Sequence, residues 1–168
     1  MTDLARVTVR VDATRDLAFT VFTDEIDTWW RKGRRYRMAE GSVMSLEPRV
    51  GGRFREVRGA KSWDMGEVIV WDPPRRLVLA WRPVNFRPAD PSTEVEVVFE
   101  RAIGHQGEGT LVTIEHRGWS KVRPDHPVRH GEAARAFIIS MGRWWGDLMS
   151  ALRERVIERN ASPPPDSG

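Results

Sequence analysis

The 168-residue sequence contains no cysteine, a single tyrosine and no run of 18 apolar residues. The absence of cysteine excludes disulfide bonds, thiolate chemistry and zinc held by sulfur, and it suits a reducing compartment. A membrane-spanning helix needs about 20 predominantly apolar residues, and a secretory signal needs an apolar stretch near its start. Because the sequence has neither, we expect a cytoplasmic protein without a membrane span.

The charges of the chain are nearly balanced. Lysine and arginine number 27 against 24 aspartates and glutamates, which leaves a formal net charge of +3. A balance this close does not argue for a nucleic-acid partner, and we predict none. One segment, Arg31–Arg37, does place five cations around Tyr36. We expect it to be a solvated loop, with the anion-attracting rim of a cavity as the alternative.

Short segments of alternating polar and apolar residues dominate the middle of the chain, separated by Gly, Pro, Asp or Asn. They predict strands at Ala5–Val11, Ser42–Pro48, Arg53–Arg58, Trp63–Trp71, Arg76–Trp81, Thr93–Arg101 and Gly109–Arg117. After the first strand, Thr14 is suited to cap a short helix, and Asp24 to begin a second one that holds Trp29 and Trp30. The pattern predicts an antiparallel meander of six or seven strands.

A long amphipathic helix is predicted from about Glu132 to Ile157, because apolar residues recur there every three or four positions. A length of 168 residues fits one domain. We therefore expect a single domain over residues 1–159 and a disordered tail at 160–168, where the sequence is NASPPPDSG.

Several motifs in this order resemble the START-like (SRPBCC) superfamily, and within it the branch related to activators of the Hsp90 ATPase. They are VTVRVDATRDLAFTVFTD before Trp29-Trp30, GGRFREV, GEVIVWDPPRRLVLAW, TEVEVVFE, GTLVTIEHRGW and GRWWGDLMSALRERV. The resemblance covers nearly the whole chain. It implies an α+β helix-grip (Bet v 1-like) fold, in which a curved sheet wraps around the C-terminal helix and encloses a mostly apolar cavity. The charged segment Ser120–Arg135 departs from the simplest pattern at one cavity entrance.

Proteins of this superfamily differ in activity, so the fold alone does not decide the function. Some carry lipids or other hydrophobic molecules, some are cyclases or hydrolases, and eukaryotic relatives stimulate a chaperone ATPase. The leading hypothesis is a small hydrophobic or aromatic ligand bound between sheet and helix. The predicted wall residues are Phe54, Leu79, Trp81, Phe99, His116, Met141 and Trp145. Ordinary core packing is the alternative for each of them.

His116 is the sharpest chemical candidate, because Thr110, Val112 and Ile114 share its strand face and should point under the helix. An imidazole there can bind a ligand oxygen or move a proton near neutral pH. The alternative is a strand-end histidine that is satisfied by backbone or water.

Glu56 and Glu67 are the carboxylates that a cyclase-like or hydrolase-like enzyme could pair with His116, since burial in an apolar pocket raises a carboxyl pKa. Nothing in the sequence shows that either is buried, and we expect both to be solvated charges on a strand face, with the buried carboxylate as the alternative. The sequence leaves open whether the chain is an enzyme and leans towards a binding protein. A third hypothesis is a module that binds a chaperone or another protein, and a homodimer also remains open.

Metal and nucleotide chemistry lack support. His126 and His130 are four residues apart, but Pro127 breaks the helical geometry that would direct both at one metal. The sequence also lacks the phosphate-binding, dinucleotide-binding and nucleophile-elbow motifs. We therefore predict no metal and no cofactor.

Overall fold

The computed structural model describes residues 3–83, 85–104 and 107–162. Its strands are β1 (Ala5–Val11), β2 (Val43–Leu46), β3 (Arg53–Arg58), β4 (Lys61–Asp72), β5 (Arg76–Trp81), β6 (Thr93–Gly104) and β7 (Gly107–Arg117). Its helices are α1 (Arg15–Thr23), α2 (Ile26–Trp29) and α3 (Ala134–Ala161), with short 3₁₀ turns η1 (Trp119–Lys121) and η2 (Pro127–Arg129). The elements follow the order that the sequence predicts.

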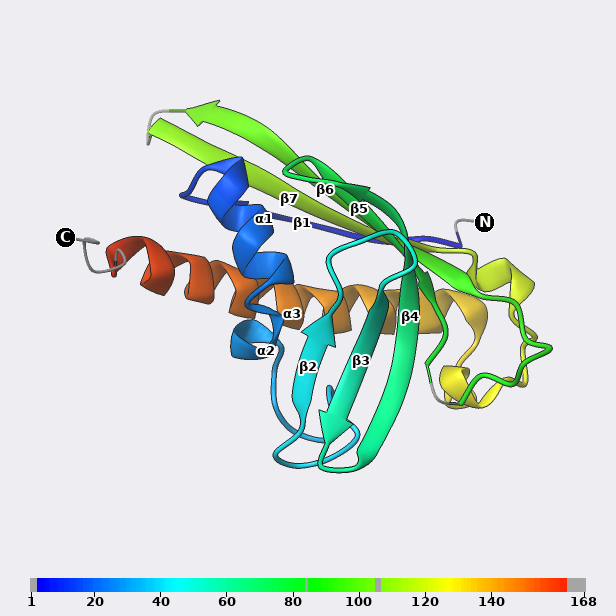
Figure 1. The fold of residues 1–168 in the computed structure, drawn as a ribbon. Helices are drawn as coiled ribbons and strands as arrows, with labels where there is room; N and C mark the ends of the chain where they lie inside the picture. Colours follow the sequence, from blue (N-terminus) through cyan, green and yellow to red (C-terminus); the bar gives the residue numbers. More distant parts are fainter. Residues whose placement is uncertain (1–2, 84, 105–106, 163–168) are drawn as a thin grey trace.

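The described strands form one antiparallel sheet of seven strands in the order β1-β7-β6-β5-β4-β3-β2. The sheet bends strongly, so that β2, β3 and β4 run steeply across the direction of β1, β6 and β7 (Figure 1). The long helix α3 crosses the molecule beside this curve, and α1 and α2 lie next to it. This arrangement confirms the predicted helix-grip fold.

Two faces of the sheet differ sharply in chemistry. Val95, Val97 and Phe99 of β6 are almost fully buried, whereas Glu94 and Glu96 alternate with them and face the other way. Both glutamates form ion pairs with Arg117 of β7, at 3.1 Å each. The period of two along a strand therefore separates a face against α3 from a charged outer face.

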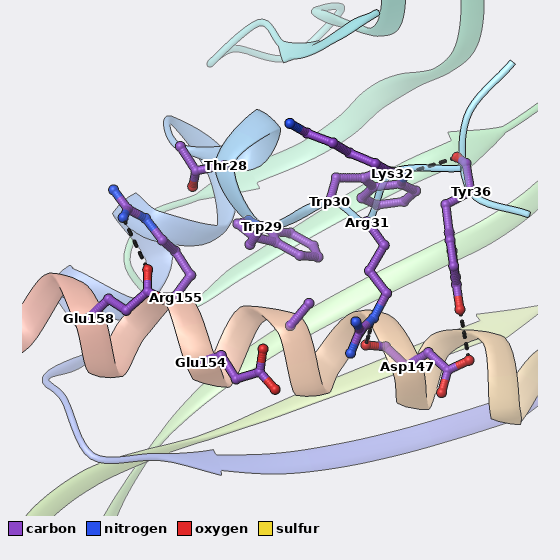
Figure 2. A pocket seen from close by; sticks show the side chains of 11 residues that line it. Thr28, Trp29, Trp30, Arg31, Lys32, Tyr36, Asp147, Glu154, Arg155 and Glu158 are labelled. Carbon is purple, nitrogen blue, oxygen red and sulfur yellow. Dashed lines mark hydrogen bonds and ion pairs between the residues drawn. The ribbon is translucent and has the colours of Figure 1, made fainter. Parts of the chain in front are cut away.

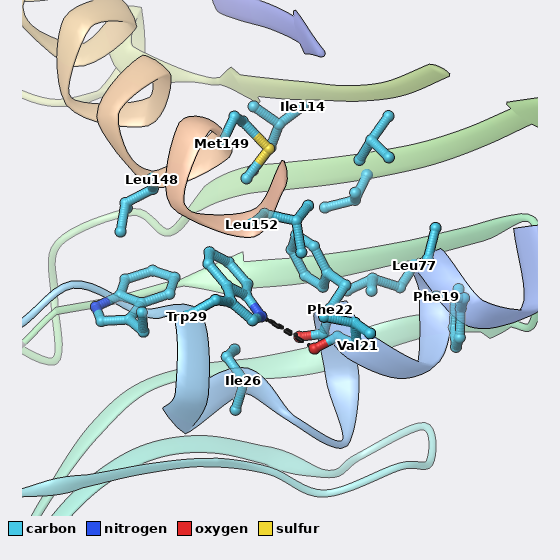
Figure 3. Close-up of a cluster of buried hydrophobic side chains, with 14 of the residues drawn as sticks. Phe19, Val21, Phe22, Ile26, Trp29, Leu77, Ile114, Leu148, Met149 and Leu152 are labelled. Atoms are coloured by element: carbon cyan, nitrogen blue, oxygen red, sulfur yellow. Dashed lines mark hydrogen bonds between the residues drawn. The ribbon is translucent and has the colours of Figure 1, made fainter. Parts of the chain in front are cut away.

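The core between sheet and helices is rich in aromatic side chains. Phe19 and Phe22 of α1 lie against Phe99, with ring centroids 5.1 and 5.7 Å apart. Trp29 packs next to Phe22 and, as Figure 3 shows, lies near Leu148 and Leu152 of α3. Thr14 caps α1 as predicted, because its hydroxyl accepts a hydrogen bond from the backbone N–H of Leu17 at 3.2 Å.

The ends of α3 differ from the prediction. The helix begins at Ala134 and continues through Ala161, so Asn160 and Ala161 are helical rather than part of the tail. The side chain of Asn160 donates to the carbonyl of Asp12 at 3.0 Å, a tertiary contact that no local pattern reveals. The rest of the predicted tail, at 163–168, lies outside the described residues.

The segment between β7 and α3, which includes most of the charged stretch Ser120–Arg135, folds into the short turns η1 and η2. Trp119, Val122 and Phe137 form a second hydrophobic cluster here, with Phe86, Val128, Ile138 and Met141 packed around it. His126 attaches this segment to the loop after β5, through its Nε2 and Asp90 at 3.0 Å. Within the described ranges, no helix has the length and hydropathy needed to cross a bilayer.

Candidate functional site

A pocket of about 620 Å³ lies between α3 and the segment that follows α2. Figure 2 shows Trp29, Trp30 and Tyr36 on one side and Asp147 and Glu154 of α3 on the other. Its lining residues are Thr28, Trp29, Trp30, Arg31, Lys32, Tyr36, Asp147, Ala151, Glu154, Arg155 and Glu158. The pocket therefore combines aromatic rings with charged groups of both signs.

Backbone acceptors fix the two tryptophans at the end of α2. The indole N–H of Trp29 donates to the carbonyls of Val21 and Phe22, at 3.0 and 3.3 Å. The indole N–H of Trp30 donates to the carbonyl of Tyr36 at 3.1 Å. Because both indole N–H groups are occupied and each residue is only 3% exposed, Trp29 and Trp30 offer a ligand no hydrogen-bond donor and only a small part of their ring surface.

Arg37 holds the basic segment in place from inside. It is only 6% exposed, and its Nη1 contacts Asp27 Oδ1 at 2.7 Å and the carbonyl of Ser42 at 2.6 Å. Its Nη2 donates to the carbonyl of Trp30 at 2.6 Å. The expectation that this segment is a solvated loop is therefore wrong for Arg37, which is a buried structural group rather than a solvated cation.

The same segment is tied to α3 around Asp147. Arg31 Nε donates to the backbone carbonyl of Asp147 at 2.8 Å, and the hydroxyl of Tyr36 donates to its carboxylate at 2.8 Å. Trp144 Nε1 donates to the carbonyl of Arg35 at 2.9 Å. Burial, together with the hydrogen bond to Asp147, raises the pKa of Tyr36 above 10.0. The phenol therefore remains a donor at neutral pH.

Behind Trp30 lies a continuous layer of rings from the predicted wall. The ring of Trp30 is 5.3 Å from Phe54 and 6.0 Å from Trp145. Trp81 lies 5.7 Å from Trp145 and 5.5 Å from His116, centroid to centroid. The structure therefore brings these four predicted residues into one cluster, in which Trp81 contacts each of the other three.

The remaining predicted wall residues lie in other parts of the interior. Phe99 contacts α1 through Phe19 and Phe22, as described above. Leu79 is 4% exposed within the main core, and Met141 is half-buried between the two clusters. None of the predicted wall residues is among those that line the pocket beside α2, so this pocket lies one layer outside the predicted position.

His116 is fully buried and both ring nitrogens have side-chain partners. Trp145 Nε1 donates to Nδ1 at 3.1 Å, so the ring proton sits on Nε2, which donates to Thr93 Oγ1 at 2.8 Å. Desolvation lowers the pKa of His116 to about 3. The geometry is that of a neutral, satisfied core histidine, although its partners are side chains rather than backbone or water.

The two candidate carboxylates have different environments. Glu56 is buried, which corrects the expectation of a solvated charge, and it accepts hydrogen bonds from the N–H groups of Met38 and Ala39 and from Ser42 Oγ, at 2.6 to 3.1 Å. Glu67 is 47% exposed and lies 3.8 Å from Arg53. Strands β4, β5 and β6 separate Glu56 on β3 from His116 on β7. The structure therefore does not bring His116 together with either carboxylate.

Tyr36 and Asp147 line the pocket and Trp144 packs against Tyr36, but none of the three is among the predicted wall residues. The signal that could have found them is weak. Tyr36 is the only tyrosine, and Trp144 and Asp147 lie on the polar flank of the apolar stripe of α3. Their pairing depends on the path of the segment after α2, which local patterns do not define.

Fold and site together define a START-like helix-grip domain. The chain belongs to the family described as "Activator of Hsp90 ATPase homolog 1-like protein", which matches residues 12–149. This confirms the resemblance stated from the sequence. A comparison with curated proteins gave no match.

Solved structures of this fold come from proteins with different descriptions. A Bacillus halodurans protein is 22% identical, with a TM-score of 0.61 over 93% of this chain and 99% of its own. The anthrahydroquino-γ-pyrone synthase Txn09 is 28% identical, with a TM-score of 0.51 over 80% of this chain and 83% of its own. An Hsp90 activator from Plasmodium falciparum is 19% identical, with a TM-score of 0.51 over 77% and 79%.

Proposed function

We propose that this protein binds a small molecule with a planar aromatic body and polar substituents in the pocket between the segment 28–36 and α3. The observation that carries the proposal is the pocket itself, about 620 Å³ in volume and bordered by Trp29, Trp30 and Tyr36. Ligand sites for small molecules usually measure 300 to 1,000 Å³ and offer ring surfaces with a few polar groups. The volume suits such a ligand, and the lining, in which polar and charged residues outnumber the aromatic ones, suits a ligand that carries polar substituents.

Two charged groups in the pocket remain available to a ligand. Within the described residues, neither the Lys32 ammonium nor the Glu154 carboxylate has a hydrogen bond or ion pair, and both line the pocket. Other charged groups there already have partners. Asp147 accepts a hydrogen bond from Tyr36, and Arg155 forms an ion pair with Glu25 at 2.7 Å. Lys32 and Glu154 can therefore bind polar substituents without first breaking an internal contact.

The predicted wall residues act in this proposal as the support behind the pocket. Phe54 and Trp145 contact Trp30 directly, and Trp81 contacts both of them. Rigid aromatic neighbours keep a binding ring in its orientation, which lowers the entropy lost on binding. His116 holds Trp145 through its Nδ1, so its contribution is to position a ring of this support.

The name of the 28% identical synthase supports the choice of an aromatic ligand class. Catalysis by this chain stays an alternative hypothesis, and the separation of His116 from Glu56 and Glu67 gives it no support. A chaperone partner and a homodimer also stay predictions, because likeness to the Plasmodium activator at 19% identity concerns the fold alone.

The experiment measures binding of anthraquinone-2-carboxylate by titration calorimetry and by the melting temperature. We expect 1:1 binding and a rise in melting temperature with ligand concentration. Ala151→Trp fills the pocket from α3 and should abolish binding. Arg153→Trp places the same ring on an exposed part of that helix, outside the lining residues, and should bind like the parent. Equal binding by both variants, or none by the parent, would refute the proposal.

A further inference from the structure

Arg129 is a buried cation without a counter-charge. It is 5% exposed, and no described carboxylate lies within ion-pair distance of it. Arg37 is buried to a similar extent but has Asp27 at 2.7 Å. An unpaired charge in an apolar environment costs several kcal/mol, so buried arginines are normally paired.

The acidic groups around Arg129 are engaged with other partners. Asp90 Oδ2 lies 3.0 Å from His126 Nε2, and Asp125 lies 3.4 Å from Arg123. Glu132 accepts a hydrogen bond from Ser140 at 3.0 Å. These three carboxylates, two in the segment of Arg129 and one in the loop after β5, thus have other partners, and none of them pairs with the buried arginine.

The nitrogens of the Arg129 guanidinium differ in their contacts: Nη2 has backbone acceptors and Nε has none among the described residues. Nη2 donates to the carbonyls of Trp119 and Val122, both at 2.8 Å, which fixes the turn η1. Nε is buried and has no acceptor among the described residues. Arg155 Nε also lacks an acceptor, but the Arg155 guanidinium has the carboxylates of Glu25 and Glu158. Of these two arginines, only Arg129 lacks a carboxylate partner among the described residues.

A second unpaired donor belongs to a residue that Arg129 contacts. Trp119 Nε1 is buried and has no acceptor in the described part of the chain, and Trp119 is 1% exposed. Phe137 contacts both side chains, with Arg129 Cζ 5.6 Å and the Trp119 ring 4.7 Å from its ring centroid. Buried donors are almost always satisfied, so two exceptions in one cluster point to an acceptor from outside the chain.

We propose that the cluster of Arg129, Trp119 and Phe137 is a binding site for a small carboxylate with an apolar body. A carboxylate offers two acceptor oxygens and one negative charge, which match two unpaired donors and one cation. A phosphate dianion would bring a second charge into an apolar environment, at a further cost. Phe86, Ile138 and Met141 are only partly buried at the edge of the cluster, and they offer the apolar body a contact surface.

This site is separate from the pocket beside α2, with which it shares no lining residue. Benzoate is the probe, and benzyl alcohol is its neutral counterpart of similar shape. At constant ionic strength set with chloride, we expect benzoate to raise the melting temperature in a saturable way and benzyl alcohol to have no such effect. Ala151→Trp should leave benzoate binding unchanged, which keeps this test independent of the proposed function.

Variants assign the effect to the two donors. Trp119→Phe keeps an aromatic ring but removes the N–H, and Arg129→Gln removes the charge; we expect each to weaken benzoate binding roughly tenfold or more, as for a hydrogen bond to a charged group. Arg123→Gln, in the same segment but exposed and paired with Asp125, is the matched control and should bind normally.

A spectroscopic readout covers the case in which Arg129→Gln does not fold. In the parent protein, benzoate should shift the Trp119 indole N–H resonance, which is assigned by its loss in Trp119→Phe. Unchanged affinity in Trp119→Phe, an unmoved indole resonance or equal effects of benzoate and benzyl alcohol would each overturn the proposal. Such a result would mean that buried water satisfies these donors.

Discussion

His116 makes the stability of this protein depend on pH in a way that can be calculated. The unfolded chain protonates His116 below about pH 6.5, whereas the folded protein does so only near pH 3, because desolvation opposes the charged ring. Between these values the unfolded state binds one more proton. Folding stability is therefore complete above pH 6.5 and falls as the pH drops towards 3.

The loss amounts to about 1.4 kcal/mol per pH unit across this range, or roughly 2 kcal/mol at pH 5. The loss of stability at pH 5 has this size whenever the pKa of His116 in the folded protein lies well below 5. It is a large part of the ~5 to 15 kcal/mol by which a domain is normally stable. Urea denaturation at pH 8 and pH 5 measures it for the parent and for His116→Asn, in which the other titrating groups are the same.

We expect the parent to lose roughly 2 kcal/mol more than His116→Asn between pH 8 and pH 5. Equal losses would refute the reasoning, as would an imidazole resonance of His116 that titrates near 6.5. If His116→Asn does not fold, the resonance alone decides, because a buried neutral ring with both nitrogens bonded must remain unprotonated at pH 5.

Three further predictions follow from single contacts. Glu56→Gln should destabilise the protein by about 1 to 3 kcal/mol in urea denaturation, since its oxygens satisfy buried donors, whereas exposed Glu67→Gln should stay within about 0.5 kcal/mol. Arg37→Met should destabilise the protein by about 2 to 4 kcal/mol, because it removes the ion pair with Asp27 and the donor to the carbonyls of Ser42 and Trp30. Absorbance near 295 nm should show Tyr36, the only tyrosine, titrating above 10.0 when folded and near 10 in urea; identical midpoints would contradict the Asp147 contact.

Strand alternation predicted the faces of the sheet correctly, and it placed Trp81 and His116 inside. Alternation does not tell whether the interior space is open or filled. In this protein Trp30, at the end of α2, occupies part of the interior and contacts Phe54 and Trp145. That contact depends on the direction of a four-residue helix, which the residue spacing along the chain does not encode.

The basic segment shows a second limit of sequence reasoning. Arg31, Arg35 and Arg37 look alike in sequence, yet Arg37 is buried on Asp27 while Arg31 and Arg35 face α3. Likewise, Glu56 shares the buried face of β3 with Phe54, but its hydrogen bonds come from the backbone of Met38 and Ala39, which belong to another part of the chain. Such long-range pairings arise only when the elements assemble.

The crystal structure of the protein with anthraquinone-2-carboxylate tests the central claim most directly. We predict that its rings lie against Trp30 and Tyr36 and that its carboxylate lies near Lys32, with α3 on the opposite side. Ligand density between the sheet and α3 against Trp81 and His116, or confined to the outer face of the sheet, would contradict this account.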